Sequence, residues 1–232
     1  AETPSLLDRK THVFYQENWH KGVVGIAASR AIEQYYRPTI ILTKSSDGIL
    51  AGSARSVQGF DIHAALEKCK EYLLQFGGHK YAAGMTLKAE NLQAFSDAFE
   101  QVGRELLTDD ILTPKIYYDA LLDVNEVNYR FYSIIQKMAP FGPGNMTPIF
   151  YAKGLKDDGT GKIIGKTEEH LKLNIKRPSG SIPSLAFGMA DQFPAIKKAD
   201  SFEACFQINE NIFRGSRTLQ LMLKDIRFTN DV

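Results

Sequence analysis

Polar side chains suited to binding an anion are interspersed with glycines in the first half of the sequence. The candidate residues are Arg30, Ser53, Arg55, Ser56, Gly77, Gly78 and His79. A guanidinium presents a planar set of donors that matches a phosphate, and serine hydroxyls add further donors. Glycine lets a backbone approach a ligand closely, and a histidine can donate to a phosphate oxygen or act as an acid. We therefore predict a phosphate-binding site assembled from separate segments of this region.

Each of these residues also has a purely structural explanation. Gly77-Gly78 is typical of the end of a helix, Arg55 can pair with a surface carboxylate, and a lone His79 is more often structural than functional. The combination of a Ser-x-Arg-Ser element and a Gly-Gly-His element on two different loops favours the anion site.

The sequence contains no recognisable set of catalytic or metal-binding residues. Its five histidines are scattered, and its two cysteines lie far apart and not at the spacing of a zinc site. The Gly-x-Ser-x-Gly motif of a hydrolase nucleophile is absent. We therefore expect neither a catalytic residue nor a metal site in this chain. The two cysteines are expected to be buried thiols of a protein in a reducing compartment, the cytoplasm.

The elements that must position the candidate residues alternate between strands and helices. Strands are expected at 11–16, 39–43, 49–56 and 85–87, and helices at 22–35, 61–76 and 92–107. Gly77-Gly78 is expected to end the second helix, which Asp61 can cap. The alternation predicts an α/β layer, in which open loops at strand ends are the usual ligand site.

The second half of the chain has a β pattern after a loop-like boundary at 108–114. A strand at 116–122, a helix at 125–138 and a Pro- and Gly-rich loop at 139–145 come first. Five further strands are expected at 149–155, 170–176, 182–187, 202–208 and around Leu219–Leu223. Five short strands with short turns suggest a small barrel. We therefore predict two domains, 1–110 and 111–232.

Basic side chains of this second domain form a candidate surface for single-stranded nucleic acid. The residues are Lys172, Lys176, Arg177, Arg214 and Arg217. Cations contact phosphates and neighbouring rings, such as Phe213, stack on bases. An ordinary solvated barrel face explains the same residues, and composition alone slightly favours that alternative.

Composition sets broad limits on the function. The 232 residues are 44% hydrophobic and 24% charged, which is typical of a soluble globular protein. The formal net charge of +1 neither supports nor excludes a nucleic-acid partner. No apolar run approaches the ~20 residues of a membrane helix, and no secretory signal is visible, so we expect no membrane association.

Taken together, the motifs resemble those of RecJ-type exonucleases of the DHH superfamily. The matching segments are 19–30, 52–60, 76–84, 139–145, 170–172, 208–210 and 213–221. They span nearly the whole chain in the same order, although the Gly-Gly-His element alone recurs across the wider superfamily. The resemblance implies a DHH-associated domain of mixed α/β structure followed by an oligonucleotide-binding (OB-fold) barrel.

The resemblance also implies a function in DNA repair and recombination. Such enzymes are 5′→3′ exonucleases on single-stranded DNA that hydrolyse phosphodiester bonds with two Mn²⁺ or Mg²⁺ ions. The metal ligands lie in an N-terminal DHH domain that this sequence lacks, so we expect a C-terminal fragment that is inactive alone. Its partners would be single-stranded DNA and that DHH domain. The seven candidate residues of the first half would hold the DNA phosphates.

Two other functions remain open. The chain could be a stand-alone module that binds single-stranded nucleic acid, without a catalytic partner. It could also belong to a phosphodiesterase of the same superfamily that acts on small nucleotides or oligoribonucleotides. Relatives of that second kind generally lack the trailing barrel, so the β-rich second half argues against it.

Overall fold

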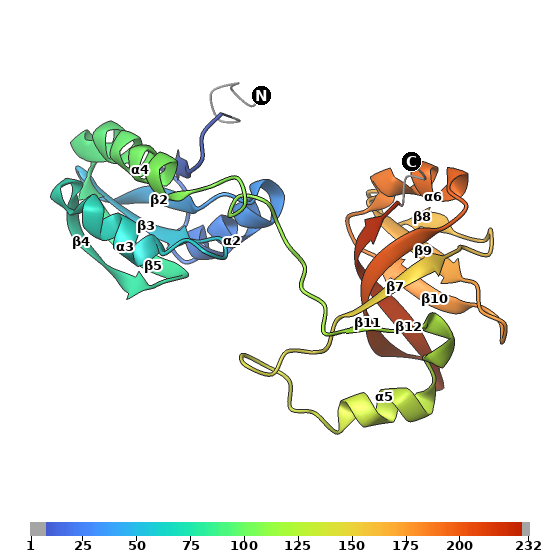
Figure 1. Cartoon of the computed structure of the whole chain (residues 1–232). Coiled ribbons are helices and arrows are strands. Elements are labelled where there is room, and N and C mark those ends of the chain that lie inside the picture. Colours follow the sequence, from blue (N-terminus) through green and yellow to red (C-terminus); the bar gives the residue numbers. More distant parts are fainter. Residues whose placement is uncertain (1–7, 229–232) are drawn as a thin grey trace. The chain divides into compact units, whose positions relative to one another are not determined.

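The computed structural model describes residues 8–228, which form two compact units (Figure 1). Unit 1 spans Ala1–Pro114 and unit 2 spans Lys115–Val232, so the division lies at the end of the segment 108–114. No helix within the described range is both long and apolar enough to cross a membrane.

Unit 1 contains a five-stranded mixed sheet with the order β1-β2-β3-β5-β4. Its strands are β1 (His12–Tyr15), β2 (Thr39–Ser46), β3 (Ile49–Arg55), β4 (Leu73–His79) and β5 (Ala82–Lys88). β1 and β2 are parallel, and all the other neighbours are antiparallel. The parallel pair requires a crossover, which α2 (Val24–Tyr35) provides.

The two faces of this sheet are covered differently. The main core lies on one face, where side chains such as Ile40, Leu50 and Leu87 pack against α3 (Ile62–Lys68) and α4 (Leu92–Leu106). On the opposite face α2 packs over β2 and β3, where Val24, Ala28 and Ile41 form a smaller cluster. The part of this face formed by β5 and β4 carries small and polar side chains instead.

The predicted helix 61–76 is wrong beyond its first two turns. Asp61 does cap α3 by accepting from the backbone N–H of Ala64 at 3.0 Å, but α3 ends at Lys68. A short 3-10 turn follows, and residues 73–79 then form the edge strand β4. This strand contains a bulge. Leu73 pairs with Leu87 and Gln75 pairs with the adjacent Thr86 of β5, so one extra residue of β4 lies between the two pairs. Gly77-Gly78 therefore lies within a strand and does not cap a helix.

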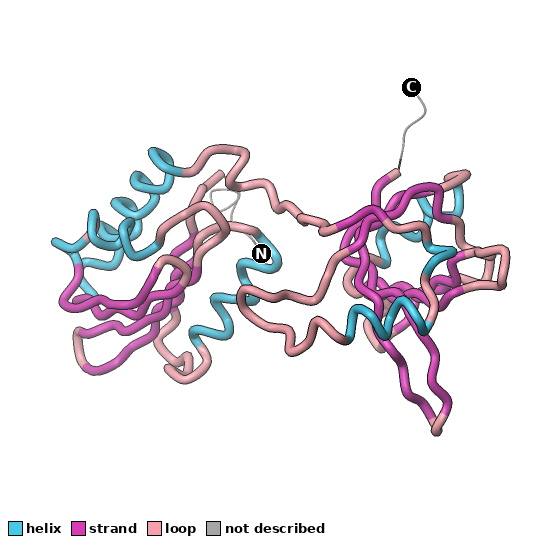
Figure 2. Tube along the Cα trace, turned by 60° about the horizontal axis from the view of Figure 1, so that its bottom comes forward, coloured by secondary structure: helices cyan, strands magenta, loops and turns pink. Residues whose placement is uncertain are grey.

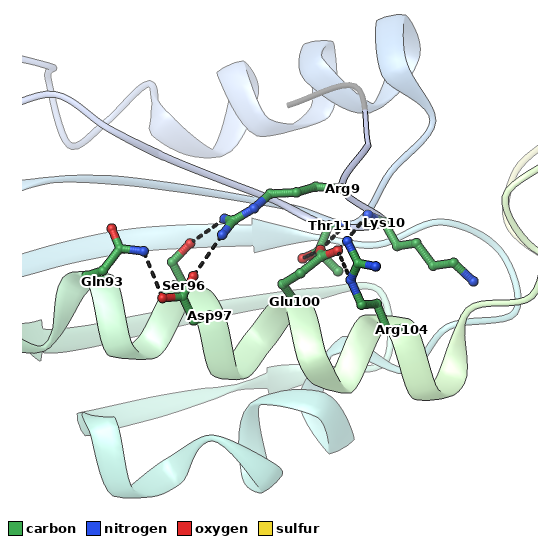
Figure 3. A network of polar contacts seen from close by, with 8 residues as sticks. All are labelled: Arg9, Lys10, Thr11, Gln93, Ser96, Asp97, Glu100 and Arg104. Atoms are coloured by element: carbon green, nitrogen blue, oxygen red, sulfur yellow. Dashed lines mark hydrogen bonds and ion pairs between the residues drawn. The ribbon is translucent and has the colours of Figure 1, made fainter. Parts of the chain in front are cut away.

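A polar network fixes the start of the described chain to α4 (Figure 3). The buried carboxylate of Glu100 accepts from the backbone N–H groups of Lys10 at 3.1 Å and Thr11 at 2.9 Å. It also accepts from the Thr11 hydroxyl at 2.8 Å and from Arg104 Nε at 2.9 Å. Four donors thus converge on one carboxylate, which offsets its loss of hydration.

Removing this carboxylate should destabilise unit 1. Glu100→Ala leaves two backbone N–H groups and a hydroxyl without their acceptor, so we expect the free energy of unfolding to fall by about 2–4 kcal/mol. Trp19 is the only tryptophan, so its fluorescence during urea unfolding reports on unit 1. Glu105→Ala on the exposed side of α4 is the control, and an equal loss in both variants would contradict the role of the network.

Unit 2 is built on a seven-stranded sheet with the order β6-β7-β11-β12-β10-β9-β8. The strands are β6 (Ala120–Leu121), β7 (Phe150–Leu155), β8 (Lys162–Ile164), β9 (His170–Ile175), β10 (Ile182–Ala186), β11 (Phe202–Phe213) and β12 (Ser216–Arg227). The helices are α5 (Tyr129–Gln136) and α6 (Phe193–Lys198).

This sheet curls so that the segment after β7 approaches β9. The segment after β7 runs beside β9, where the Lys176 N–H donates to the carbonyl of Lys156 and the Asp158 N–H donates to that of Asn174, both at 2.8 Å. Alternate side chains of the strands, such as Leu171, fill the interior. A mixed α/β layer followed by a mostly β unit confirms the predicted fold class.

The predicted strands of unit 2 are confirmed, with differences at the edges. The five strands expected in the second half all form. β11 was expected to end at residue 208 but continues to Phe213. The predicted strand 116–122 is reduced to Ala120–Leu121, and the predicted helix 125–138 is reduced to a 3-10 turn and α5. The Pro- and Gly-rich segment 139–145 is a loop, as expected.

Candidate phosphate-binding site

The side chains of Ser53 and Arg55 lie on the same face of β3, because alternate residues of a strand point the same way. Arg55 Nη1 donates to Ser53 Oγ at 2.7 Å and to the carbonyl of Ala54 at 2.8 Å. These two bonds fix the half-buried guanidinium. Its other N–H groups have no acceptor within residues 8–228 and can bind a ligand. The surface carboxylate considered for Arg55 is likewise not found in the described chain.

The first turn of α2 lies directly over this guanidinium. A Cβ atom added to Gly25 would lie 2.8 Å from Arg55 Nη2 and 3.2 Å from Ser53 Oγ. The helix begins after Val23 without a side-chain cap. Because the first N–H groups of a helix have no intrahelical acceptor and carry a partial positive charge, this turn favours an anion. The helix terminus and Arg55 therefore create positive potential at the same place.

The Gly-Gly-His element reaches the same face two strands away. In β5, Gly84 pairs with Ser53 of β3 on one side and with Gly77 of β4 on the other. The next row of the same face is formed by Arg55, Ala82 and His79. β3 and β4 are thus about 10 Å apart, the width of two strand spacings. The structure therefore brings the two predicted elements onto one accessible surface.

The glycines between them serve different purposes. A Cβ at Gly78, where φ is +148°, would lie 2.3 Å from the carbonyl oxygen of Ala82, so this glycine is required by the close approach of β5. A Cβ at Gly77 would meet nothing within 4 Å, and one at Gly84 would meet only the Gly52 oxygen at 3.9 Å. Gly77 and Gly84 also line a shallow groove of ≈ 270 Å³. Neither the backbone nor the packing explains these two glycines.

The remaining candidates differ in availability. His79 is exposed, and its Nδ1 accepts from the Tyr81 N–H at 3.3 Å, which leaves Nε2 for a ligand. The Ser56 hydroxyl donates to the carbonyl of Phe60 at 2.7 Å and so supports the loop after β3. Arg30 is not brought to this site, because it lies on the exposed side of α2 and pairs with Glu33 at 2.7 Å.

Two features of the site are absent from the predicted residue set. They are the uncapped start of α2 at Gly25 and the bare glycine at position 84. Both positions were visible in the sequence as small residues beside the chosen motifs. Their roles become clear only from the pairing of β3, β5 and β4 and from the placement of α2.

The basic residues of unit 2 are distributed over several surfaces. Lys172 and Lys176 are exposed on and just beyond β9. Arg214, with φ +50°, lies at the tip of the β11–β12 hairpin, where its guanidinium is 5.2 Å from the Phe213 ring centre. This hairpin projects from the sheet as a long ribbon (Figure 2). Arg217 is 3.7 Å from Glu210 and is therefore partly neutralised.

The Arg177 side chain is half-buried and bonds to the protein backbone. Its Nη1 donates to the carbonyl of Val127 at 2.8 Å, and its Nε is buried without a partner among the residues described. Burial lowers the pKa of this guanidinium. Together with Lys153 and Lys176 it nevertheless lines a groove of ≈ 850 Å³ beside β7. The groove therefore has a basic wall, although Arg177 itself is only half-exposed.

Comparison with known proteins agrees with the two-unit architecture. The family described as "DHHA1 domain" matches residues 8–105, and the family described as "RecJ OB domain" matches residues 118–225. The chain is a DHHA1 domain followed by a RecJ OB domain. Its unit 1 and unit 2 correspond to these two domains in turn.

Relatives that match most of this chain are named as exonucleases. The "single-stranded-DNA-specific exonuclease RecJ" of Haemophilus influenzae is 33% identical over 90% of this chain, and that of Bacillus subtilis is 30% identical over 94%. The chain covers 37% and 28% of these relatives, so it spans about a third of their length and resembles their C-terminal portion. A crystal structure of RecJ from Thermus thermophilus, in complex with Mg²⁺, shares the fold with a TM-score of 0.78 at 24% identity, covering 96% of this chain and 33% of that one.

The DHHA1 and OB domains of this chain do not offer a metal-binding set. Within residues 8–228 no group of three or more histidine, cysteine, aspartate or glutamate side chains is arranged to hold a metal ion. The residues described here therefore do not fit the divalent ions that the resemblance implies. The chemistry available to them is the binding of an anion by Arg55, His79 and the start of α2.

Proposed function

We propose that this chain is the C-terminal, substrate-binding part of a RecJ-like 5′→3′ exonuclease that acts on single-stranded DNA in repair and recombination in the cytoplasm. The observation that carries the proposal is the position of the Arg55 guanidinium at the uncapped start of α2, on the same sheet face as His79. A phosphate at this position would contact a fixed cation and a helix N-terminus together.

Different residues of this sheet face would contact different parts of the bound DNA strand. Arg55 binds one phosphate, with Ser53 holding the guanidinium in place. His79 lies on β4, about 10 Å from β3, and would contact another phosphate of the same DNA strand. Gly77 and Gly84 leave the surface between them free of side chains, so the sugar or base of the bound nucleotide can approach the backbone.

Catalysis would come from elsewhere in the polypeptide. We propose that Mn²⁺ or Mg²⁺ would be held by an N-terminal DHH domain outside this chain, where the ions would activate the water that hydrolyses the phosphodiester bond. The OB domain would bind and orient the DNA strand with four exposed basic side chains, Lys172, Lys176, Arg214 and Arg217. Arg177 would lie at the edge of the basic groove. Arg30 has no part in this proposal, because it lies away from the site.

The separation of binding from cleavage can be tested on the chain itself. We expect the 232-residue chain to bind oligothymidylate weakly, with an affinity that falls as salt rises, because phosphate contacts release counterions. We expect no hydrolysis of the same oligonucleotide in Mn²⁺ or Mg²⁺. Fluorescence anisotropy and gel analysis of end-labelled DNA measure the two properties. Metal-dependent cleavage by the purified chain would contradict the proposal, and binding that is insensitive to salt would argue against phosphate contacts.

A change at Gly25 should separate stability from binding. Alanine favours a helix over glycine by about 1 kcal/mol, but its Cβ would displace the Arg55 guanidinium from the start of α2. Gly25→Ala should therefore keep or raise the melting temperature and lower the affinity for single-stranded DNA about tenfold. Ala27→Gly, on the exposed side of the same helix, should lower the melting temperature and leave the DNA affinity unchanged. Unchanged DNA affinity in Gly25→Ala would show that no anion binds beneath α2.

A further inference from the structure

The strands β8 and β9 of unit 2 (Figure 1) carry two lysines that lie opposite each other in the antiparallel register. The register places Lys162 directly opposite Lys172, and both side chains are exposed. Directly opposite residues of an antiparallel pair have Cβ atoms about 5 Å apart, and like charges there are destabilising. Neither ammonium has a carboxylate within ion-pair distance in the described part of the chain, although Glu168 and Glu169 lie in the turn between the strands. The fold therefore maintains an unneutralised pair of positive charges.

An exposed aromatic ring lies beside this pair. His170 is two residues before Lys172 and so lies on the same face of β9. Its ring centre is 5.0 Å from that of Phe187, which follows β10 and is 54% exposed. The Gly188 N–H donates to His170 Nδ1 at 3.1 Å, which fixes the imidazole against the ring. Phe187 is thus held in place with one side open.

We propose that Lys162 and Lys172 together bind one phosphate of a single-stranded nucleic acid and that Phe187 stacks on an adjacent base. The inference rests on the proposed function and specifies where the strand lies on the OB domain. A phosphate between the two ammonium groups removes their repulsion and accepts charge-assisted hydrogen bonds from both. A base stacks on any exposed ring without regard to sequence. An acidic peptide could neutralise the lysines, but its carboxylates would leave the Phe187 ring unused.

The first test measures stability without DNA. The variant Lys162→Gln/Lys172→Gln removes the repulsion, so we expect its melting temperature to rise by about 2 °C or more in calorimetry of the whole chain. The matched control is Lys137→Gln/Lys198→Gln, which removes two charges from the ends of α5 and α6 and should give no rise. A melting temperature that is unchanged or lower in the first variant would contradict the unneutralised pair.

The second test measures the affinity for oligothymidylate as a function of salt. Because both lysines contact one phosphate, their joint replacement should reduce the slope of log K against log salt by about 0.7, and not by about 1.4 as for two phosphates. Phe187→Leu should weaken binding about tenfold at low and high salt alike, because stacking is not screened. The control pair should leave both quantities unchanged.

The outcomes separate this inference from the proposed function. If the parent chain does not bind oligothymidylate, the proposed function fails. If the parent binds but the variants at 162, 172 and 187 bind equally well, only the inference is wrong. If the lysine variant loses affinity for polyglutamate to the same degree as for oligothymidylate while Phe187→Leu has no effect, the surface is a general anion site and the assignment to nucleic acid is overturned.

Discussion

Replacing Arg55 by glutamine should lower the rate of DNA cleavage at least 100-fold in the longer polypeptide that carries the metal-binding domain. The change removes the fixed cation beneath α2 and leaves a phosphate there without the Arg55 contact. A misplaced phosphate costs both binding and the alignment of the scissile bond. Single-turnover cleavage of end-labelled single-stranded DNA measures the rate. In the 232-residue chain alone, the same variant should bind DNA at least tenfold more weakly.

The matched control for this experiment is Arg30→Gln. It removes an equal charge from the same unit, but from an exposed side chain that pairs with Glu33. We expect its cleavage rate to stay within twofold of the parent. Circular dichroism and thermal unfolding of both variants test whether either substitution causes a folding defect. Full cleavage by Arg55→Gln, or an equal loss in both variants, would show that Arg55 has no specific contact with the substrate.

Alanine at Gly78 should cost most of the stability of unit 1, whereas alanine at Gly84 should cost none. At Gly78 the added Cβ would lie 2.3 Å from a backbone oxygen and 2.5 Å from the Ala83 Cα, at a φ of +148° that disfavours side chains. We expect a loss of more than about 3 kcal/mol in the free energy of unfolding. At Gly84 the Cβ would meet only the Gly52 oxygen, at an ordinary contact distance of 3.9 Å, and alanine restricts the unfolded chain, so stability should rise slightly.

The two variants should rank differently in DNA binding. Gly84→Ala places a methyl group between Ser53 and Gly77 on the candidate binding face, so we expect weaker binding by a well-folded protein. Urea unfolding followed by Trp19 fluorescence and anisotropy with labelled oligothymidylate provide the two measurements. Parent-like DNA affinity in Gly84→Ala would mean that the bare backbone of β5 is not approached by the substrate.

Much of the fold could be predicted from sequence where one local pattern has one structural cause. The buried run 39–43 and the alternation at 170–176 became β2 and β9, because burial on both faces or on one face leaves a direct imprint on residue type. The apolar segment 116–122 was misleading for a different reason. Only Ala120–Leu121 finds a neighbouring strand, in β7, and Tyr117 remains 66% exposed. A strand needs a partner, which its own sequence does not reveal.

The failed helix 61–76 shows how a bulge can imitate a helix. Leu73 and Phe76 both pack on the core, although they are three positions apart and a regular strand would place them on opposite faces. The bulge at the half-exposed Leu74 corrects the alternation, so the spacing continues the helical stripe of α3. The candidate site could also be predicted only in part from local sequence. Ser53, Arg55 and His79 were identified by residue type, but their position on one face follows from the pairing of β3 and β4 with β5.

The same bulge has a consequence for how the Gly-Gly-His motif can be used to annotate other sequences. If residues 73–79 formed a regular strand without this bulge, the imidazole of His79 would point toward the hydrophobic interior, although every letter of the motif would be intact. The face on which the motif lies therefore depends on the bulge between it and the upstream helix. A homologue that kept the three letters in a strand of this length without the bulge would be a poor candidate for the same chemistry.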